Sequence, residues 1–577
     1  MKIRDLEWWI VGVLGIIAFI LAMIGFNIMF TCAGIERNML DLAFQSMKIF
    51  GMEFVDEFAS PLPVQLEIAR WLAPLVVLYT AAKAIIYFVR REFRSLLIKF
   101  NNDHIIITSL NDKSRFLIND LLAKNEKVIV VASIDSPGKL DLIEKDGAIL
   151  IEGSISDQRF LKNIAAHKAR YMMFMEDDDE KNISSAISVY QFLEKYGKDK
   201  IQTLFVHVAD DLKLNELKEL SFFEEFASGK NINEVCDIRI FSMNERTSRI
   251  LFNKYSPDIF TPVHSSDAAQ LHVALFGSND LTQSMIIRLA RLGRYANLKK
   301  LKITLFHEGD RIVNKLKNSF PALNQLIDLD LIDAPLDMFD IEIFDKIHIG
   351  HPFSSAYILC KDDALSSYIL NKLSKTKSEN KIDVIIGLMN PDGILNKWYT
   401  GRMLEKINLH KFNLIEESFT KNAIISEEID KLAMIIHQDY LSKLKKRDPA
   451  KLSHQDWAAL PVDFKNQNRE QADHLYVKLR AMNCEALLSG QEKGKSVSIS
   501  NDSPFMELLA EMEHDRWQAH MLLNGWTYNK TRDDQKKYHT DLVPYNQLSE
   551  EVKDWDRNAI ANMPVLLSKL GFVIRKL

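Results

Sequence analysis

The sequence predicts a membrane hairpin of two helical spans, followed by α/β domains with doubly wound parallel sheets and by a mainly helical C-terminal region. Three observations predict this fold class. Two apolar runs lie before residue 90, buried-strand runs alternate with helical segments from residue 104 to 388, and the region after residue 420 contains an internal repeat. A chain of 577 residues is too long for one core, and its length alone predicts roughly four domains of ~150 residues each.

Residues 8–30 form the first apolar run, in which 23 consecutive residues carry no charge. A helix of that length measures ~34 Å and crosses a hydrocarbon layer of ~30 Å. A cleaved signal peptide is the alternative, but the run is longer than an h-region and no A-x-A-like site follows it. The second run, residues 71–89, contains Pro74 and Lys83. We expect a second span that is kinked or tilted near Pro74, with Lys83 reaching an interface.

Charges next to the two runs predict the topology. Lys2 and Arg4 precede the first run, and four basic residues between 90 and 99 follow the second. By the positive-inside rule both termini are cytoplasmic, so we expect a two-span inner-membrane protein with a large cytoplasmic C-terminal region. Residues 44–58 are apolar enough to enter the bilayer as a re-entrant segment, and a solvated external loop is the alternative. No TVGYG-like filter is present, so potassium selectivity is not supported.

Composition excludes several classes of protein. With 47% hydrophobic residues, 26% charged residues and a net charge of −5, the chain is neither disordered, nor a basic nucleic-acid-binding protein, nor a polytopic transporter. The four cysteines are widely separated and form no CxxC pair: Cys32, Cys236, Cys360 and Cys484. They predict neither a disulfide framework nor a zinc site, and we expect a reducing compartment for most of the chain.

Alternating strands and helices after residue 100 predict a first doubly wound domain, residues 101–260. Its strand runs are 104–110, 127–134, 148–152 and 171–175. Residues 149–182 resemble the N-terminal RCK domain of Trk-type regulators of potassium conductance. The resemblance rests on five positions: Gly153, Asp157, Asp177, Asp178 and Asn182. It implies a Rossmann-like fold.

The dinucleotide signature in this domain is weak. The turn after the first strand, residues 109–114, contains Asn111 but no glycine that would let the backbone approach a pyrophosphate. Asp135 ends the second strand, where an acidic residue would bind a ribose, although its sequence context also forms an ordinary turn. We therefore do not expect NAD as a cofactor, and Asn111 and Asp135 remain candidate nucleotide-binding residues.

The same pattern recurs over residues 261–420 and predicts a second Rossmann-like domain. The predicted strands of this domain are residues 272–276, 301–306, 356–360 and 383–388. In the turn after the first of them, Gly277 and Asn279 are candidate nucleotide-binding residues. Two such domains after membrane helices resemble the gating apparatus of channels with paired RCK domains. That resemblance implies a ring-shaped homo-oligomer, with a tetramer as the expected form.

Residues 505–574 resemble the ryanodine-receptor (RyR) repeat domain. Its hallmarks occur in order: His514 with Trp517, Gly-Trp-x-Tyr at 525–528, Arg-Asp-Asp at 532–534, His539, Leu-Val-Pro-Tyr at 542–545, and Asp556-Arg557. The resemblance implies a mainly helical domain over residues 500–577.

An internal comparison finds a diverged copy of this domain over residues 421–490. His437 matches His514 at an offset of 77, whereas Trp457 and Arg469 match Tyr545 and Arg557 at an offset of 88. The second copy therefore has 11 additional residues between the two matching blocks, around residues 526–538.

Aromatic and basic residues in the two copies are the candidate ligand-binding residues. Aromatic faces stack on nucleobases, and arginine guanidinium groups bind phosphates or carboxylates. An alternative is that these side chains fill small cores or cap helices. The candidates are Tyr440, Trp457, Lys465, Arg469, Trp526, Arg532, Tyr538, Tyr545 and Arg557. A small nucleotide-derived ligand is the expected partner, and no direct nucleic-acid binding is expected.

No catalytic constellation is found. The sequence has no HExxH, P-loop or GxSxG motif, and we do not expect an enzyme. The acidic run 176–180 has two interpretations, a divalent-cation site or a solvated helix start, and we predict no metal site.

These features together predict a ligand-gated membrane effector or channel-like protein. In this hypothesis the RyR repeats sense a nucleotide-derived signal, an RCK-like ring transmits it, and the membrane helices respond. The resemblance to bacterial proteins with these parts implies a role in antiviral defence linked to CRISPR or cyclic nucleotides. Two alternatives stay open: an RCK-type regulator or channel for potassium or cation homeostasis, and a membrane-anchored enzyme that processes nucleotides.

Overall fold

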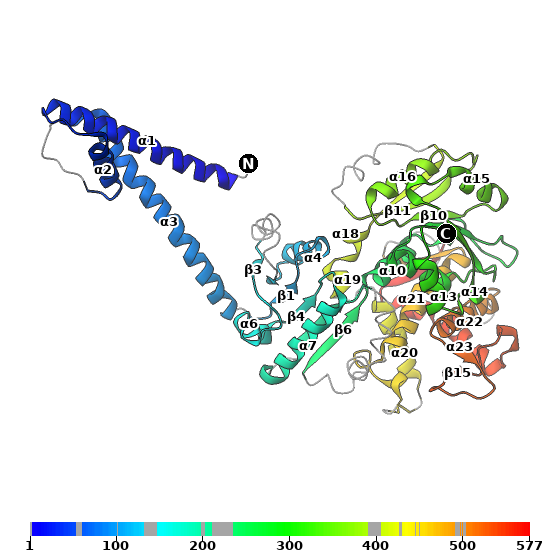
Figure 1. Cartoon of the computed structure of the whole chain (residues 1–577). Helices are drawn as coiled ribbons and strands as arrows, with labels where there is room; N and C mark the ends of the chain where they lie inside the picture. Colours follow the sequence, from blue (N-terminus) through cyan, green and yellow to red (C-terminus); the bar gives the residue numbers. More distant parts are fainter. Residues whose placement is uncertain are drawn as a thin grey trace. The chain divides into compact units, whose positions relative to one another are not determined.

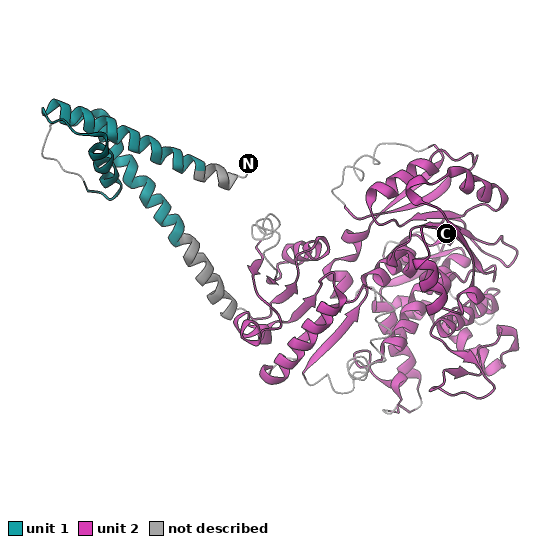
Figure 2. Cartoon of the chain, viewed as in Figure 1, with its two compact units in different colours: residues 1–101 teal, residues 102–577 magenta. Residues whose placement is uncertain are grey.

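The computed structural model divides into two compact units, residues 1–101 and 102–577 (Figure 2). The residues that it describes are 3–53, 61–100, 102–131, 147–197, 202–209, 235–390, 405–425, 430–444, 446–448, 451–490, 497, 499 and 503–577.

The described residues of the first unit form three helices: α1 (Ile3–Cys32), α2 (Met39–Phe50) and α3 (Val64–Phe100) (Figure 1). Small residues let α1 and α3 pack closely, since a Cβ atom at Gly25 would lie only 2.7 Å from the Cβ of Leu66. Pro74 lies inside α3, as expected from its position in the second apolar run.

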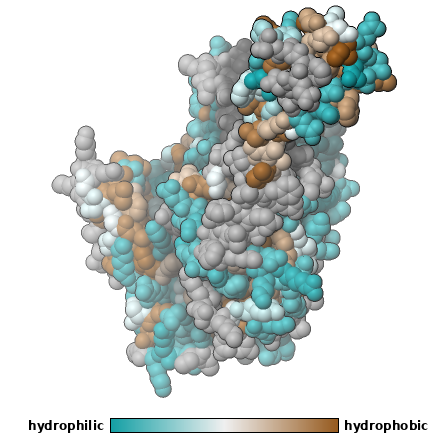
Figure 3. Space-filling view, turned by 90° about the vertical axis from the view of Figure 1, so that its left-hand side faces the viewer, coloured by the Kyte–Doolittle hydropathy of each residue, from teal (hydrophilic) through white to brown (hydrophobic). Residues whose placement is uncertain are grey.

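Two segments of these helices, Trp9–Cys32 and Val64–Ile85, are long and apolar enough to cross a membrane. Much of their apolar surface faces outward: Trp9 is 67% exposed and Ile16 is 61% exposed. In Figure 3, apolar side chains at the surface are coloured brown. The predicted re-entrant segment, 44–58, covers the end of α2, and its residues 54–58 lie outside the described residues.

The second unit begins with a six-stranded parallel sheet in the order β3-β2-β1-β4-β5-β6. Its strands are β1 (Ile105–Thr108), β2 (Val128–Val131), β3 (Ile149–Ile151), β4 (Tyr171–Phe174), β5 (Gln202–His207) and β6 (Cys236–Phe241). The helices α4 (Asp112–Ala123), α6 (Gln158–Asn163), α7 (Asp179–Tyr196) and α10 (Met243–Lys254) connect or follow them. The strand order is that of a doubly wound Rossmann fold, which confirms the predicted fold class of this region.

A second six-stranded parallel sheet follows, in the order β12-β11-β10-β7-β8-β9. Read from its β9 edge, this order repeats that of the first sheet. Its strands are β7 (His272–Phe276), β8 (Leu301–His307), β9 (Ile327–Asp333), β10 (Ser355–Ile358), β11 (Ile382–Leu388) and β12 (Ile407–Asn413). Its helices include α12 (Asp280–Leu292), α13 (Arg311–Ser319), α14 (Leu323–Leu326), α15 (Ile341–Gly350) and α16 (Asp363–Leu373).

Two short helices after the second sheet return to the first one. The helices α18 (Leu414–Ser418) and α19 (Lys421–Ile424) bury Ile415, Phe419 and Ile424 in the hydrophobic core of the first sheet. Lys421 Nζ contacts Glu126 Oε1 at 2.6 Å and reinforces this packing. The two Rossmann-like regions are therefore joined by a chain segment that crosses from one to the other.

The C-terminal region is mainly helical, as predicted. The first copy contains α20 (Lys431–Lys443), α21 (Val462–Ala481) and β13 (Cys484–Leu488). The second contains α22 (Met506–Leu523), β14 (Thr527–Tyr528), β15 (Tyr538–His539), α23 (Glu550–Ala561), α24 (Met563–Ser568) and β16 (Phe572–Lys576). Their apolar side chains join those of the second sheet and α12 in one continuous hydrophobic core.

The two copies meet through an antiparallel pair formed by β13 and β16. Ala486 pairs with Ile574, which is its equivalent at the offset of 88, and Cys484 and Leu488 pair with Lys576 and Phe572. The two strands occupy equivalent positions in the two copies, and their middle residues, which are also equivalent, pair with each other. Such a pair is related by a local two-fold axis, as in an isologous dimer. This register supports the internal repeat that the sequence predicts.

Candidate functional site

The first turns of the two Rossmann-like sheets have the same construction. Asn111 caps α4 by accepting a hydrogen bond from Ser114 N at 2.8 Å, and its Nδ2 donates to Met175 O at 2.8 Å. Asn279 caps α12 through Thr282 N at 2.9 Å, and its Nδ2 donates to Leu359 O at 2.8 Å. Each asparagine thus links the ends of two neighbouring strands at the point where the strand order reverses.

Gly277 is required by internal packing at this turn. Its φ is 150°, and a Cβ atom there would lie 2.5 Å from Leu359 O and 2.3 Å from Thr282 Oγ1. The glycine therefore has a structural reason that is independent of a phosphate. Asp135 lies outside the described residues. Nucleotide binding at Asn111, Gly277 and Asn279 stays a prediction.

The acidic run 176–180 surrounds the start of α7. The Asp178 side chain caps the helix by accepting from Glu180 N at 2.9 Å, and Asp179 accepts from Ala209 N at 2.8 Å. Asp177 contacts Lys113 Nζ at 3.3 Å. Within the described ranges, no three His, Cys, Asp or Glu side chains are grouped as metal ligands.

Equivalent ion pairs occupy the two C-terminal copies. The Arg469 guanidinium donates to Asp430 Oδ2 at 2.8 and 2.6 Å, and the Arg557 guanidinium donates to Glu507 at 2.6 and 3.1 Å. Asp430 and Glu507 are themselves related by the offset of 77. The guanidinium groups of Arg469 and Arg557, which were predicted to bind an anionic ligand, are thus already bound to a carboxylate of the chain.

Aromatic contacts in the two copies are matched in the same way. His437 Nε2 lies 2.7 Å from Gln455 O, and His514 Nε2 lies 2.8 Å from Val543 O, which is the equivalent carbonyl. A lysine ammonium lies 6.0 Å from the Trp457 ring in the first copy and 5.5 Å from the Tyr545 ring in the second. These repeated contacts hold equivalent helices together.

The predicted ligand-binding residues therefore fall into several places. Tyr440, Trp457, Lys465 and Arg469 lie in the first copy, with the Tyr440 ring 6.2 Å from that of His437. Tyr545 and Arg557 share Glu507 in the second copy. Arg532 pairs with Asp534 at 2.7 Å in the segment 526–539, whose two short strands pair in parallel and the second of which begins at Tyr538. Ligand binding by these residues stays a prediction.

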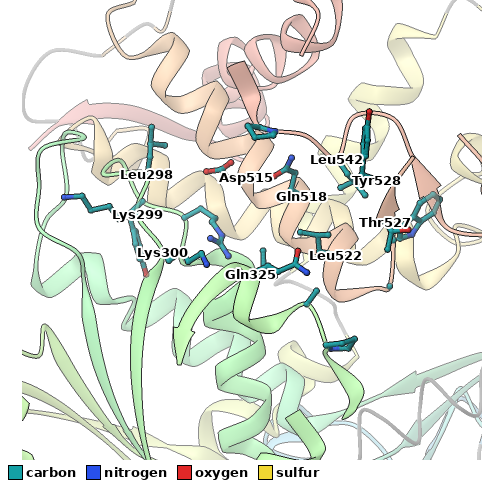
Figure 4. A pocket seen from close by; sticks show the side chains of 18 residues that line it. Leu298, Lys299, Lys300, Gln325, Asp515, Gln518, Leu522, Thr527, Tyr528 and Leu542 are labelled. Atoms are coloured by element: carbon teal, nitrogen blue, oxygen red, sulfur yellow. The ribbon is translucent and has the colours of Figure 1, made fainter. Parts of the chain in front are cut away.

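Trp526 lies apart from these pairs and lines a cavity of 720 Å³ between the second copy and the second Rossmann-like sheet (Figure 4). The RyR-like side contributes α22 and the segments after it, and the Rossmann-like side contributes the loop after α12 and the chain around α14. The lining residues are Arg294, Tyr295, Leu298, Lys299, Lys300, Pro321, Ala322, Gln325, Leu326, Asp515, Gln518, Leu522, Gly525, Trp526, Thr527, Tyr528, Leu542 and Pro544. A volume of this size suits a small organic ligand, for which sites measure ~300–1,000 Å³.

Three cationic side chains line the Rossmann-like wall of the cavity. Lys299 Nζ donates to Ala268 O at 2.9 Å and Lys300 Nζ to Asn324 O at 3.1 Å, so both ammonium groups bind neutral carbonyls. Arg294 Nη2 donates to Ala290 O at 2.7 Å, whereas its Nε is buried and has no hydrogen-bond partner among the described residues. Burial lowers the pKa of Arg294, which shows that its cation is poorly solvated.

The opposite wall supplies aromatic rings and one acid. Trp526 and Tyr528 come from the start of the segment 526–539, and Tyr528 is 53% exposed. Asp515 and Gln518 project from α22 toward the cavity (Figure 4). Burial raises the pKa of Asp515, and the nearby Arg294 only partly opposes that rise. The cavity can therefore receive an anionic group at one wall and a flat ring at the other.

The sequence interpretation missed most of this cavity. Arg294, Lys299 and Lys300 follow a helix in a lysine-containing segment that is typical of a solvated loop. Their position opposite Trp526, more than 220 residues further along the chain, is created by tertiary packing alone. The hallmark segments 525–528 and 542–545 were the available sequence signal, since both contribute lining residues.

Buried ion pairs join the helices next to the cavity. Arg291 of α12 contacts Glu470 of α21 at 3.0 Å, and Glu470 contacts His520 of α22 at 2.9 Å. Lys478 and Arg516 contact Glu513 at 2.5 and 2.8 Å. Burial alone would raise the pKa of Glu470, but His520, Arg291 and Arg516 hold it well below its usual range. The Rossmann-like domain and both copies are therefore electrostatically interlocked.

Comparison with protein families confirms two of these regions. Residues 105–222 match the TrkA-N domain, the RCK-type Rossmann domain, and residues 495–576 match the RyR domain. The chain thus contains a TrkA-N domain and a RyR domain, together with two apolar N-terminal helices.

The comparison with solved structures finds distant matches. A structure of GsuK bound to ADP is 12% identical, covers 74% of this chain and 100% of that chain, and has a TM-score of 0.37. The GsuK channel bound to NAD is 11% identical, with coverage of 73% and 84% and a TM-score of 0.36. The human SLO3 gating ring is 9% identical, with coverage of 58% and 85% and a TM-score of 0.38. No curated protein matches the chain.

Proposed function

We propose that this chain is a membrane-anchored, channel-like effector that is gated by a nucleotide-derived ligand. The cavity at the junction of the RyR domain and the second Rossmann-like sheet carries the proposal. Its cations Arg294, Lys299 and Lys300 come from one domain, and the aromatic rings of Trp526 and Tyr528 come from the other. A ligand that contacts both walls binds more tightly to the arrangement of the two domains that brings the walls together than to other arrangements. Such a difference in affinity between conformations is what a ligand needs in order to shift their populations and so to gate a channel.

The remaining parts of the chain fit this role. The TrkA-N match supports a regulatory role at a channel. In the proposal, α1 and α3 span the membrane, the cytoplasmic domains assemble as a homo-oligomeric ring, with four subunits, and the ring transmits the ligand signal to the helices. The proposed setting is antiviral defence, in which a nucleotide second messenger triggers membrane leakage. The ligand is bound without chemical change, which mass spectrometry after incubation would check.

A second candidate function is regulation of potassium or cation homeostasis, which the TrkA-N domain favours. In this case the Rossmann-like sheets, rather than the RyR cavity, would bind the controlling nucleotide. Calorimetry with NAD and ATP on the full chain, compared with an Asn279→Asp variant, separates the two functions. Binding that the Asn279 change abolishes favours homeostatic regulation.

Ion leakage from liposomes tests the main proposal. The purified full chain is reconstituted in vesicles that contain a potassium-sensitive dye, and a panel of nucleotides is added on the side of the RyR domain. We expect leakage with at least one nucleotide and about a tenfold weaker response when Lys299 and Lys300 are both changed to Glu, because two cations of the cavity are lost.

The matched control is Lys377→Glu, which alters a 68% exposed lysine of the same Rossmann-like region outside the cavity. Its response should equal that of the unmodified chain. Absence of leakage with every nucleotide, although binding is measured, would refute the gating proposal.

A further inference from the structure

The cavity contains an acid that a simple anion-binding site would not have. Asp515 lies in the RyR-like wall, and Arg294, Lys299 and Lys300 lie in the other wall. Asp515 forms no hydrogen bond or ion pair with another described residue, and its effect on Arg294 is a longer-range attraction. Both charges are half-buried and neither is neutralised by direct contact.

A ligand that fills this cavity must satisfy both charges. The cationic wall needs an anion with several acceptor oxygens, such as a phosphate chain. The Asp515 carboxylate is acceptor-only when ionised, so it needs a hydrogen-bond donor on the ligand and repels a second anion. An unpaired buried charge of this kind is a recognised way to reject the wrong partner.

The aromatic rings narrow the ligand class. Trp526 and Tyr528 belong to the same RyR-like wall of the cavity as Asp515. A flat ring stacked on these aromatic side chains would therefore bind at the wall that also carries this carboxylate. A nucleotide has the three required parts in one molecule: phosphates, a flat base, and donor groups on the base and ribose. An inorganic polyphosphate has only the first.

We infer that Asp515 is a specificity-determining residue that makes this cavity accept a nucleotide and reject an inorganic polyphosphate of equal charge. The inference rests on the proposed function only in taking this cavity as the ligand site. Asp515 would accept hydrogen bonds from the nucleoside, while Arg294, Lys299 and Lys300 bind the phosphates.

Competition between charge-matched pairs tests the inference. Binding to the full chain in detergent is measured by tryptophan fluorescence and calorimetry for ADP against pyrophosphate and ATP against tripolyphosphate, with NAD and cyclic dinucleotides as further probes. We expect a nucleotide to bind at least about tenfold more tightly than the matched polyphosphate. In Asp515→Asn, we expect polyphosphate to bind about tenfold more tightly and the preference to fall to about threefold or less.

Glu511→Gln is the matched control, because it removes one acid from the same helix outside the cavity lining. It should leave the preference unchanged, and Arg294→Gln should weaken both members of each pair. Any of three results would overturn the inference. The unmodified chain could bind nucleotide and polyphosphate equally, the Asp515→Asn variant could keep the preference unchanged, or no nucleotide could bind at all. Selective binding without liposome leakage would refute the gating proposal alone, whereas leakage without selectivity would refute only the role of Asp515.

Discussion

Glu470 shows how single residues stabilise the cytoplasmic unit. Its carboxylate is 2% exposed and is contacted by Arg291 at 3.0 Å, His520 at 2.9 Å and Arg516 at 3.7 Å. Taking these charges out of water is costly, and only their mutual attraction offsets that cost. Loss of this carboxylate would leave its cationic partners buried without an opposite charge. Substitution here should therefore destabilise the protein far more than substitution in a surface ion pair.

We expect Glu470→Ala to lower the free energy of unfolding by about 3–5 kcal/mol, because it breaks a buried ionic cluster. Urea unfolding of the full chain in detergent, followed by fluorescence, measures the change. The control is Asp534→Asn, which removes the partner of Arg532 in an exposed pair and should cost about 1 kcal/mol or less. Equal effects of the two changes would contradict the prediction.

At the level of secondary-structure elements, the two C-terminal copies differ chiefly in the segment 526–539. Both have the helix with the equivalent histidine, the pairing of arginine with a carboxylate, and the final strand. Among the described residues of the two copies, only the second has the parallel strands β14 and β15, which flank its 11-residue excess. The segment 526–539 contributes Trp526 and Tyr528 to the cavity. In the proposed function, the first copy is therefore mainly a structural partner, and the second presents the ligand cavity.

Shortening the segment 526–539 to the length of the first copy tests this division. We expect deletion of residues 527–537 to abolish nucleotide binding, because Thr527 and Tyr528 are removed from the cavity wall and Trp526 loses the segment that follows it. The unfolding midpoint should fall by only a few degrees, about 2–4 °C per kcal/mol, since most of the deleted residues are exposed. Differential scanning calorimetry and nucleotide titration measure the two effects. Binding that survives the deletion would place the ligand elsewhere.

At the level of the whole molecule, buried carboxylates couple the stability of the second unit to pH. Burial raises the pKa of Glu513, but Arg516 and Lys478 outweigh this and lower it to about 2. Asp430 and Glu470 are lowered well below their usual range by their arginine and histidine partners. A depressed folded-state pKa stabilises the protein above the unfolded-state pKa of about 4.5, and this stabilisation disappears as the pH falls through the folded-state value.

We therefore expect stability to fall steeply between about pH 4.5 and 2. It should already decline below about pH 6.5, because burial lowers the pKa of His104 and His207 to about 4 and these side chains must gain a proton when the chain unfolds. The raised pKa of His514, which Asp556 favours against the effect of burial, has the opposite sign: its stabilisation is complete below about pH 6.5. Thermal unfolding at constant ionic strength measures the profile. Replacement of Glu513 by Gln should flatten its acid limb, and an unchanged slope would exclude this carboxylate as a cause.

The sequence predicted those strands and helices that have a clear pattern of apolar residues along the chain. Strands such as β1, β2 and β7 are continuous apolar runs because both faces of a parallel sheet are buried. It did not identify β9, whose residues 327–333 alternate between apolar residues and aspartates, because this edge strand is exposed on one side. The sequence singled out Asn111 and Asn279 as candidate nucleotide-binding residues, but not as helix caps, and their bonds to Met175 and Leu359 depend on strands about 64 and 80 residues away.

By itself, the sequence determined the membrane-length helices, the two parallel sheets, the RyR domain and its diverged copy. Hydrophobic periodicity, the length of apolar runs and motif spacing can be read from the sequence without knowing how the chain packs. Only the tertiary structure decided which charged residues neutralise one another and which remain available to a ligand. Arg469 and Arg557 were engaged by carboxylates from another helix, whereas Arg294, Lys299 and Lys300 met Trp526 across a cavity. The free energy of a charge depends on its neighbours in space, and the folded chain alone sets those neighbours.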